Sequence, residues 1–394
     1  MRINKIYSLS FLLLVLLISC NENSNKKEST NVVSVDSLLL IRYHKLLDFP
    51  VDSVAFPRSY NTKTKEVFKV ASSDWTSGFY PGNLWQLYKL TGDEAFKTKA
   101  KAWTAFMEKE KTNGGTHDMG FKMYCSYGEG YEVNGIEKYK EVLLESATTL
   151  ATRYNEKVGS LRSWDFNKDI WEFPVIIDNM MNLELLFEAT KISGDSTFHK
   201  IAVQHANTTL KNHFREDNSS VHVVVYDTIS GQVKDKVTHQ GFNDNSAWAR
   251  GQAWGIYGFT MCYRYTKNVL YLEQAEKSAA FYLNHDNLPE DGIPYWDFND
   301  PKIPNVVKDV SAATITASAL VELSSYTNDT SYLDYADKVL NILKSEEYIL
   351  SSEIEAPFIL DHSTGNWPKK DEMDEPIVYG DYYFLELILR SEKI

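Results

Sequence analysis

The chain has 394 residues, of which 43% are hydrophobic and 24% charged, a balance typical of a soluble globular protein and not of a disordered or fibrous one. With 41 Lys+Arg against 54 Asp+Glu its formal net charge is −13, which argues against non-specific nucleic-acid binding, because that needs a basic surface. The 9 Trp, 24 Tyr and 19 Phe often lie beside Asp, Asn or Gly, as in sites that stack on sugars, although most such rings belong in a core.

The first 20 residues are typical of an export signal, with two early cations and then an apolar run, Phe11–Ile18, too short for the about 20 residues of a membrane span. Leu17-Ile18-Ser19-Cys20 resembles a bacterial lipobox, in which the cysteine becomes the lipidated first residue. Residues 21–35 then form a polar tether. We therefore predict a lipid anchor on Cys20 and a place in the bacterial cell envelope, at the periplasm or outer membrane. The alternative is a plain signal peptide with a chance cysteine.

Residues 36–394 contain two alternating kinds of helical pattern and no Pro/Gly/Ser-rich linker, so we predict one domain. Patterns with Lys and Glu on one face indicate outer helices, near 36–48, 93–110, 137–155, 195–214, 268–286 and 330–346. Patterns that are apolar almost all round indicate inner helices, near 78–90, 118–128, 174–191, 246–266, 310–326 and 381–392. Six outer and six inner helices are the number that closes an (α/α)6 barrel, with an all-α fold.

The helix junctions share one sequence pattern: an apolar helix end, a Gly or Asn suited to a left-handed cap, and a new helix start. Gly92, Gly194 and Asn268 stand at three of these junctions. The pattern indicates helix hairpins repeated around the fold.

The first segments with chemical interest are SSDWTSGFYPG (72–82), which carries Trp75, and THDMGFKMYCSYG (116–128). Asp118 lies at the start of a predicted inner helix, where Asp often serves only as an N-cap. Asp118 can share a pocket with a carboxylate 60 residues away only if successive inner helices present their ends to one face. The predicted barrel supplies that arrangement.

The segment WEFPVIIDNMMNLELLFEA (171–189) contains Asp178 inside an apolar run. Pro174 is predicted in the first turn of a helix, with Ile176 starting an apolar stripe at helical spacing and Asn182 one turn after Asp178. Burial would raise the pKa of Asp178, and a carboxyl that keeps its proton near neutral pH is a candidate general acid. The alternative is a buried carboxyl satisfied by structural hydrogen bonds.

Residues 220–237, SVHVVVYDTISGQVKDKV, alternate around an SGQ turn and predict a small β-hairpin at the barrel rim, which could deliver His222 to a pocket. The segment FNDNSAWARGQAWGIYGF (242–259) follows Gln240 and places Arg250 and Trp254 four residues apart. An Arg beside an indole suits a sugar that carries a carboxylate, and the alternative is a structural cation–π pair.

Glycines in the same segment, Gly251, Gly255 and Gly258, would allow close helix packing. Further along, Asp297, Asp300 and Asp309 fit loop and cap positions better than catalytic ones.

Five motifs in one order and spacing resemble the unsaturated glucuronyl hydrolases, family 88 of the glycoside hydrolases. They are DWTSGFYPGNLWQLY, HDMGFKMYCSYG, IIDNMMNLELLFEA, NDNSAWARGQAWGIYGF and PYWDFNDP, and the likeness extends from about residue 36 to the end. The resemblance implies an (α/α)6 barrel and an exo-acting enzyme that needs no metal or other cofactor. It also implies substrates left by polysaccharide lyases, short oligosaccharides with a 4,5-unsaturated uronic acid at the non-reducing end.

The resemblance further implies a hydration reaction instead of direct attack at the anomeric carbon. An acid protonates C4 of the vinyl ether, water adds at C5, and the hemiketal opens and expels the remaining sugar. By motif, Asp178 is that acid and then the base, with Asp118 as the second essential carboxylate. The implied binding residues are His222 and Gln240 along the reacting ring, Arg250 and Trp254 at the uronate, Trp75 and Trp164 as stacking rings, and His117 and Asn179 beside the carboxylates.

Our leading hypothesis is therefore an unsaturated glucuronyl hydrolase acting on glycosaminoglycan fragments. Two alternatives stay open. One is an unsaturated rhamnogalacturonyl hydrolase acting on pectin fragments, and the other is a surface barrel that binds carbohydrate without catalysis, for which the aromatic residues would suffice.

Overall fold

Six helices with an exposed polar face form the outer layer of the computed structural model, which describes residues 35–393. They are α1 (Val35–Asp48), α3 (Glu94–Phe106), α5 (Glu137–Ala151), α7 (Ser196–Asn212), α9 (Val269–Leu283) and α11 (Ser331–Leu343). The predicted outer helices are therefore all present, although most of the predicted ranges extend a few residues beyond the observed C-terminal end of the helix. The predicted export signal, Cys20 and all but the last residue of the tether lie outside the described residues.

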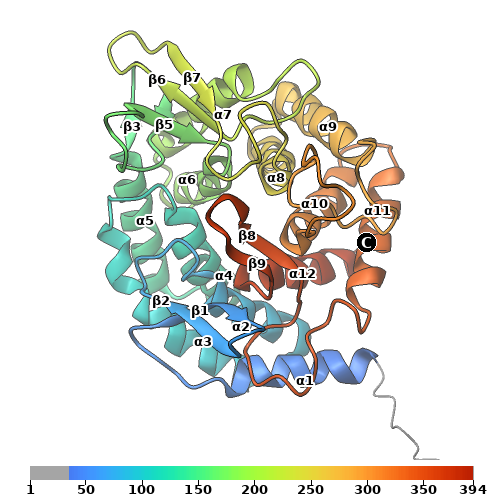
Figure 1. Ribbon diagram of the computed structural model, residues 1–394. Coiled ribbons are helices and arrows are strands. Elements are labelled where there is room, and N and C mark those ends of the chain that lie inside the picture. The colour runs from blue at the N-terminus through green and yellow to red at the C-terminus, as the bar shows by residue number, and fades with distance from the viewer. Residues whose placement is uncertain (1–34, 394) are drawn as a thin grey trace, which may run out of the picture. The chain divides into compact units, whose positions relative to one another are not determined.

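The inner layer is a closed ring of largely buried helices. It consists of α2 (Phe79–Thr91), the π-helix η2 (Gly120–Gly128) continued by α4 (Glu129–Asn134), α6 (Asn179–Ser193), α8 (Ala249–Thr266), α10 (Val310–Ser324) and α12 (Val378–Ser391). Each member packs against the next, and α12 packs against α2 to close the ring (Figure 1). The (α/α)6 barrel is thereby confirmed.

The second member of the inner ring departs from α-helical geometry. The segment predicted as an inner helix near 118–128 is a π-helix, with Gly78 of the α2 start lying directly against it. A Cβ on Gly78 would be 2.3 Å from the carbonyl oxygens of Phe121 and Lys122, and one on Gly120 would be 2.6 Å from Cα of Asn182. Only glycine allows these backbones to approach so closely, and π-helical turns are frequent at functional sites.

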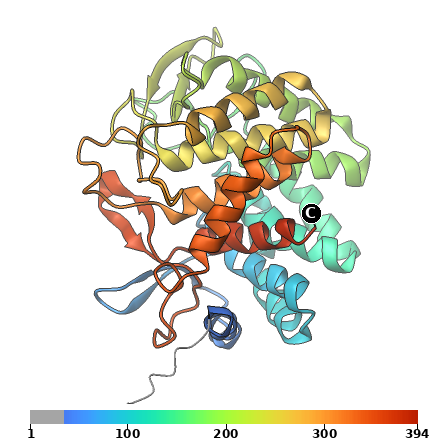
Figure 2. The ribbon, with the colours of Figure 1, turned by 90° about the vertical axis from the view of Figure 1, so that its right-hand side faces the viewer.

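The described part of the chain contains four small antiparallel sheets, including the hairpin near residue 370, in red, that projects from the helices (Figure 2). Their strands are β1 (Phe56–Asn61) with β2 (Glu66–Val70), β3 (Tyr154–Asn155) with β4 (Ser160–Leu161), β5 (Phe173–Ile176) with β6 (Val223–Tyr226) and β7 (Val233–Val237), and β8 (Ser363–Asn366) with β9 (Asp371–Glu375). The 3-10 turns η1 (Glu108–Thr112) and η3 (Trp367–Lys369) complete the elements. The predicted hairpin at 220–237 is confirmed as β6–β7.

The predicted helix start at Pro174 is wrong, because residues 173–176 form strand β5, and Ile176 belongs to that strand. Phe173 pairs with Tyr226 and Ile176 with Val223. Strand β5 lies at the edge of its sheet, where a proline, which has no N–H to donate, is tolerated. The consequence for function is that α6 begins only at Asn179, so Asp178 lies at the very start of the helix.

Two of the predicted left-handed junctions are confirmed. Gly92 and Gly194 both end their helices with positive φ, and each backbone N–H bonds back into the last turn. At the third junction the prediction for Asn268 is wrong, since Lys267 takes the left-handed conformation and Asn268 instead caps the next helix through Leu270 N. Within the described part of the chain, no helix is long and apolar enough to cross a membrane.

Candidate active site

The inner helices begin at one end of the ring, and their starts carry most of the predicted site residues. Asp178, Trp248 and Asp309 are the N-caps of α6, α8 and α10, and Tyr379 lies in the first turn of α12. Helix N-termini carry partial positive charge from their unpaired backbone N–H groups. Their convergence provides local positive potential in a protein whose net charge is strongly negative, which suits an anionic ligand.

Asp178 occupies an N-cap position without capping. Its backbone is α-helical, and its side chain makes no capping hydrogen bond to the first turn of α6. The residue is buried, and Oδ2 has no hydrogen-bond partner among the described residues. Burial raises the pKa of Asp178 from 3.8 to about 7, against the opposing effect of the Arg250 charge, while Asp118 raises it further. A carboxyl with this pKa holds a proton for a large fraction of the time at neutral pH.

Asp381 shows what a purely structural buried carboxyl looks like in the same protein. Its pKa is also raised to about 7 by burial, but its two oxygens accept hydrogen bonds from the backbone N–H groups of Ile359 and Leu360. Asp178 differs because one buried oxygen is left without such a bond. This difference favours a chemical role for Asp178 over the structural alternative.

Asp118 is brought to the same place by the contact between η2 and α6. Phe121 N donates to Oδ1 of Asn182 at 3.0 Å, which ties the start of η2 to α6 one turn after Asp178. The Asp118 carboxylate accepts a hydrogen bond from Oγ1 of Thr116 at 2.6 Å and lies 3.2 Å from Nε2 of His117. The Asp118 side chain makes no hydrogen bond to a first-turn N–H of η2 among the described residues, so the carboxylate does not act as a side-chain cap.

His222 precedes strand β6 and faces Asp178. The distance between Nε2 of His222 and Oδ2 of Asp178 is 3.8 Å. The other ring nitrogen, Nδ1, accepts hydrogen bonds from the backbone N–H groups of His239, at 3.0 Å, and Gln240, at 3.1 Å. Burial holds the pKa of His222 well below its usual range, so the ring is neutral and carries its proton on Nε2. His222 is therefore a fixed N–H donor aimed at the carboxyl of Asp178.

Arg250 is buried in the first turn of α8 and is held from several sides. It forms an ion pair with Asp309 at 2.7 Å, donates to the carbonyl oxygens of Thr364 and Gly365, and lies 4.5 Å from the ring of Trp248 and 5.3 Å from that of Tyr379. These bonds use three of its five N–H donors, and no described residue accepts from the other two. The guanidinium thus keeps donors for a ligand.

The indole predicted beside Arg250 has a different neighbourhood. Trp254 is completely buried, with ring centroids 5.2 Å from Phe121 and 5.5 Å from Tyr383, and its Nε1 has no hydrogen-bond partner among the described residues. It is close enough to Asp178 to lower the pKa of that carboxyl. The cation–π partners of Arg250 are instead Trp248 and Tyr379.

The other predicted binding residues surround this centre. Gln240 donates from Nε2 to the carbonyl of Gly365 at 3.2 Å, Asn179 donates to that of Leu161 at 3.0 Å, and His117 N donates to that of Ser163. Half-buried Trp75 packs against Tyr379 at 5.0 Å, and half-buried Trp164 lies 6.4 Å from the ring of His222.

Sequence reasoning missed the hairpin β8–β9, whose carbonyls bond Arg250 and Gln240, and the two rings that enclose the guanidinium. Trp248 lies in the same motif as Arg250, and its position as the N-cap of α8 could have suggested it. Asp309 was placed correctly as the cap of α10, but its ion pair with Arg250 was not foreseen.

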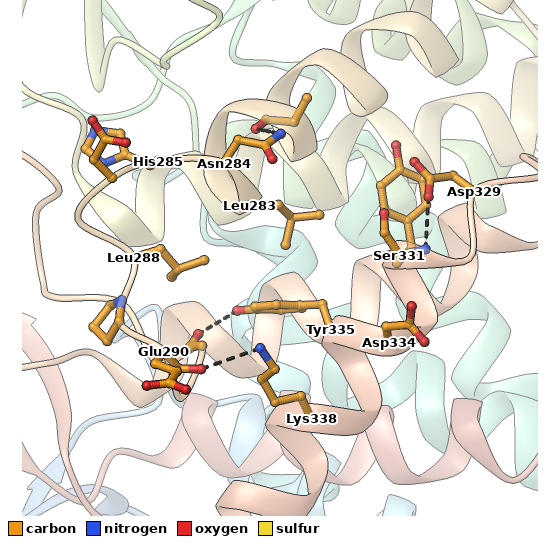
Figure 3. Close-up of a pocket in the computed structure, with 15 residues that line it drawn as sticks. Leu283, Asn284, His285, Leu288, Glu290, Asp329, Ser331, Asp334, Tyr335 and Lys338 are labelled. Atoms are coloured by element: carbon orange, nitrogen blue, oxygen red, sulfur yellow. Dashed lines mark hydrogen bonds between the residues drawn. The ribbon is translucent and has the colours of Figure 1, made fainter.

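A surface cavity of about 570 Å³ lies elsewhere, between the end of α9 and the start of α11 (Figure 3). It is lined by Asp286, Glu290, Asp329 and Asp334, with Leu283 and Tyr335 among its apolar walls. One of its polar groups, the Tyr335 hydroxyl, donates to Gly292 O at 2.8 Å. None of the predicted site residues lines this cavity, and it lacks the unpaired buried groups that gather around Asp178.

Comparisons with known proteins show which family the chain resembles. The model of Glycosyl Hydrolase Family 88 matches residues 53–288. An unsaturated glucuronyl hydrolase of Formosa agariphila is 62% identical, over 94% of this chain and 93% of that protein, and an unsaturated chondroitin disaccharide hydrolase of Streptococcus pneumoniae is 32% identical, over 82% and 83%. The crystal structure of an unsaturated glucuronyl hydrolase specific for heparin superimposes with a TM-score of 0.88 at 43% identity, over 91% of this chain and 97% of that one.

Proposed function

The chain belongs to glycoside hydrolase family 88, and from this premise we propose that it is an exo-acting unsaturated glucuronyl hydrolase. It would remove a 4,5-unsaturated uronic acid from the non-reducing end of glycosaminoglycan oligosaccharides that lyases have produced. The observation that carries the proposal is the buried carboxyl of Asp178, which makes no capping hydrogen bond to α6. This carboxyl faces His222, and the charges of Asp118 and Arg250 are close enough to shift its pKa.

In the proposed reaction Asp178 acts first as an acid. Its proton passes to C4 of the vinyl ether, the positive charge develops at C5 and the ring oxygen, and the new carboxylate of Asp178 together with Asp118 stabilises that charge. Asp178 then accepts a proton from the water that adds at C5. The resulting hemiketal opens and expels the remaining sugar, so that one water is consumed in total.

The surrounding groups have separate duties in this scheme. Arg250 offers its two remaining N–H donors to the uronate, and Trp254 and Trp75 bound the space for the sugar ring. The Nε2–H of His222 hydrogen-bonds the carboxylate of Asp178 or the attacking water, and Gln240 lies beside it. His117 and Asn179 orient the two carboxyl groups.

The substrate preference follows from the relatives only as an expectation. Two facts support glycosaminoglycan fragments over pectin fragments: one similar structure is specific for heparin, and several relatives are chondroitin disaccharide hydrolases. The identity is higher to the heparin-specific protein, 43% against 32%, which supports heparin-derived disaccharides as the first to test.

The decisive experiment follows the ultraviolet absorbance of the C4=C5 double bond, which disappears when the ring is hydrated. Unsaturated disaccharides from heparin, chondroitin, hyaluronan and pectin are compared with the purified protein. We expect rapid loss of absorbance with at least one glycosaminoglycan disaccharide. Faster loss with the pectin fragment would favour the rhamnogalacturonyl alternative, and binding without any loss would indicate a non-catalytic carbohydrate-binding barrel.

We further propose that Cys20 is lipidated and that the polar segment 21–35 tethers the barrel to the bacterial cell envelope. The lipobox-like sequence before Cys20 supports this. Metabolic labelling with a fatty-acid analogue in a Gram-negative expression host tests it. Cys20→Ala should abolish the label and release the protein from the membrane fraction, and an unchanged label would refute the assignment.

A further inference from the structure

Four aromatic rings cluster at the rim of the site, on the loop between β4 and β5 and on the segment after β7. Trp164 and Phe166 are stacked, with centroids 4.7 Å apart and planes inclined by 16°. Trp171 lies 5.4 Å from Trp164, and His239 lies within 5.7 Å of all three other rings. The cluster is continuous with the catalytic centre, because Trp164 is the neighbour of His222.

The outer side of this cluster is exposed although its loop is firmly held. Phe166 is 46% exposed and Ile170 73% exposed. Asp165, which lies between Trp164 and Phe166 in the sequence, accepts hydrogen bonds from Arg153 and Arg162, both at 3.0 Å. Large apolar side chains that stay exposed on a well-anchored loop indicate a binding surface and not a poorly packed loop.

The loop is anchored at its other end as well. The backbone N–H of Trp171 donates to Asn167 O at 2.8 Å, and the carboxylate of Glu172 accepts from Thr228 and from Lys234 on the neighbouring β6–β7 hairpin. The rings are therefore preorganised, and binding to them would cost little loop ordering.

Exposure is greater at the rim cluster than at the catalytic centre. Arg250 and Trp254 in the centre are almost completely buried, Trp164 beside His222 is half-buried, and Phe166 and Ile170 on the loop are open to solvent. An exo-acting enzyme holds the terminal residue in the closed end, so the rest of the substrate must leave through the open end. Phe166 covers one face of Trp164 and is itself 46% exposed, so the outermost stacking surface that the cluster offers to a more distant sugar is that of Phe166.

We propose that Phe166 and Trp171 form an outer sugar-binding subsite, which contacts a residue on the reducing side of substrates longer than a disaccharide. This inference rests on the proposed function for the direction of the substrate. Aromatic rings offer a rigid apolar surface to the apolar face of a sugar ring, and the subsite extends the stacking surface of Trp164 outward. The protein would therefore bind lyase-generated tetrasaccharides more tightly than disaccharides of the same polymer.

The test measures dissociation constants by calorimetry in the Asp178→Asn protein, in which turnover is removed. An unsaturated disaccharide and the matching tetrasaccharide of one glycosaminoglycan are compared. We expect the tetrasaccharide to bind more tightly, and Phe166→Ala or Trp171→Ala to reduce that preference by about 5- to 10-fold. Phe166→Tyr, which keeps the ring, should restore the preference. The matched control is Ile229→Ala, since Ile229 is 83% exposed at the turn between β6 and β7.

The possible outcomes separate this subsite from the proposed function. Equal preference for the tetrasaccharide in the Phe166→Ala, Trp171→Ala and control proteins would overturn the subsite, and so would the absence of any tetrasaccharide binding. Loss of the double-bond absorbance with the unaltered enzyme tests the proposed function independently. A reduced preference combined with no turnover by the unaltered enzyme would leave the subsite standing as a carbohydrate-binding feature and reject the hydrolase.

Discussion

His222 directs a single, fixed N–H group at Asp178. Its Nδ1 accepts from two successive backbone N–H groups, and its Nε2 lies 3.8 Å from Oδ2 of Asp178. Because a nitrogen that accepts two hydrogen bonds cannot itself be protonated, the tautomer is determined by the fold. The general acid thus faces a histidine that does not compete with it for the proton, although the two groups are too far apart for a hydrogen bond.

The neutral state of His222 gives the first prediction. Burial lowers its pKa, so the ring should be neutral, with the proton on Nε2, at about pH 6.5, where an ordinary histidine is half protonated, and at every higher pH. Nitrogen NMR of histidine-labelled protein checks this, and the His222→Gln spectrum identifies the signal by its loss. A His222 signal that shifts to the doubly protonated form in that range would contradict the prediction.

The second prediction concerns the pH dependence of activity. Asp178 must be protonated to act as the acid, and its pKa is about 7. The rate constant kcat/KM should therefore fall as the pH rises through about 7, because this parameter reports ionisation of the free enzyme. A profile that rises through this range, as expected for a group needed in its ionised form, would exclude this role.

Stability supplies an independent check on the same carboxyl. The folded pKa of Asp178 is raised, so the unfolded chain releases its proton above about pH 4 while the folded protein retains it until about pH 7, and stability is lost across that window as the pH rises. Asp178→Asn avoids this loss. Its Tm should exceed that of the parent at about pH 8, with a smaller difference at about pH 4.

The control for that measurement is Asp381→Asn. Asp381 is also buried, but its oxygens accept from Ile359 N and Leu360 N, and an amide offers only one acceptor oxygen in their place. This variant should lose stability at both pH values. A destabilised Asp178→Asn protein would show that Asp178 is a structural carboxyl like Asp381.

Close packing of α8 against α6 gives a prediction with a matched pair of variants. A Cβ on Gly258 would lie 2.4 Å from Cβ of Met180, whereas one on Gly255 would lie 3.5 Å from the Phe214 ring, an ordinary contact. Gly258→Ala should therefore cost about 1–3 kcal/mol of unfolding free energy. Gly255→Ala should be neutral or slightly stabilising, since alanine favours helices. Denaturant titration compares the two, and equal losses would contradict the proposed contact.

Arg250 forms a buried ion pair with Asp309, so its role in substrate binding must be separated from its role in stability. We expect Arg250 to matter for binding even after Asp309 has been replaced by a neutral residue. Arg250→Met leaves the carboxylate of Asp309 buried and unpaired, which should cost about 3–5 kcal/mol of stability. The double variant Arg250→Met/Asp309→Asn should recover part of this stability while KM stays high. Recovery of KM together with stability would show that Arg250 acts only through the fold.

The helical frame was predictable because each inner and outer helix has its own pattern of apolar spacing, and glycines such as Gly92 and Gly194 mark the ends. The start of α6 was not, because Pro174 at a helix start and Pro174 in an edge strand look alike until the pairing with β6 is known. Hairpin β8–β9 escaped notice because STGNWPKKDEMDE has few of the β-branched and aromatic residues that signal strands.

The site was predictable to the level of residue types and less so to the level of contacts. Asp178 and Asp118 could be placed at one end of the barrel from the helix count alone. Two partners of Arg250 could not, since Asp309 and Tyr379 come from the starts of α10 and α12, which only the closed ring brings to α8. Long-range contacts of this kind leave no local pattern in the sequence.

The most direct measurement is the rate at which Asp178→Asn removes the ultraviolet absorbance of an unsaturated glycosaminoglycan disaccharide, with calorimetric binding of the same sugar as the companion. An amide cannot supply the proton that C4 requires. We expect kcat to fall by at least about 100-fold while the disaccharide still binds. Turnover close to that of the unaltered enzyme would show that another group delivers the proton and would contradict the account.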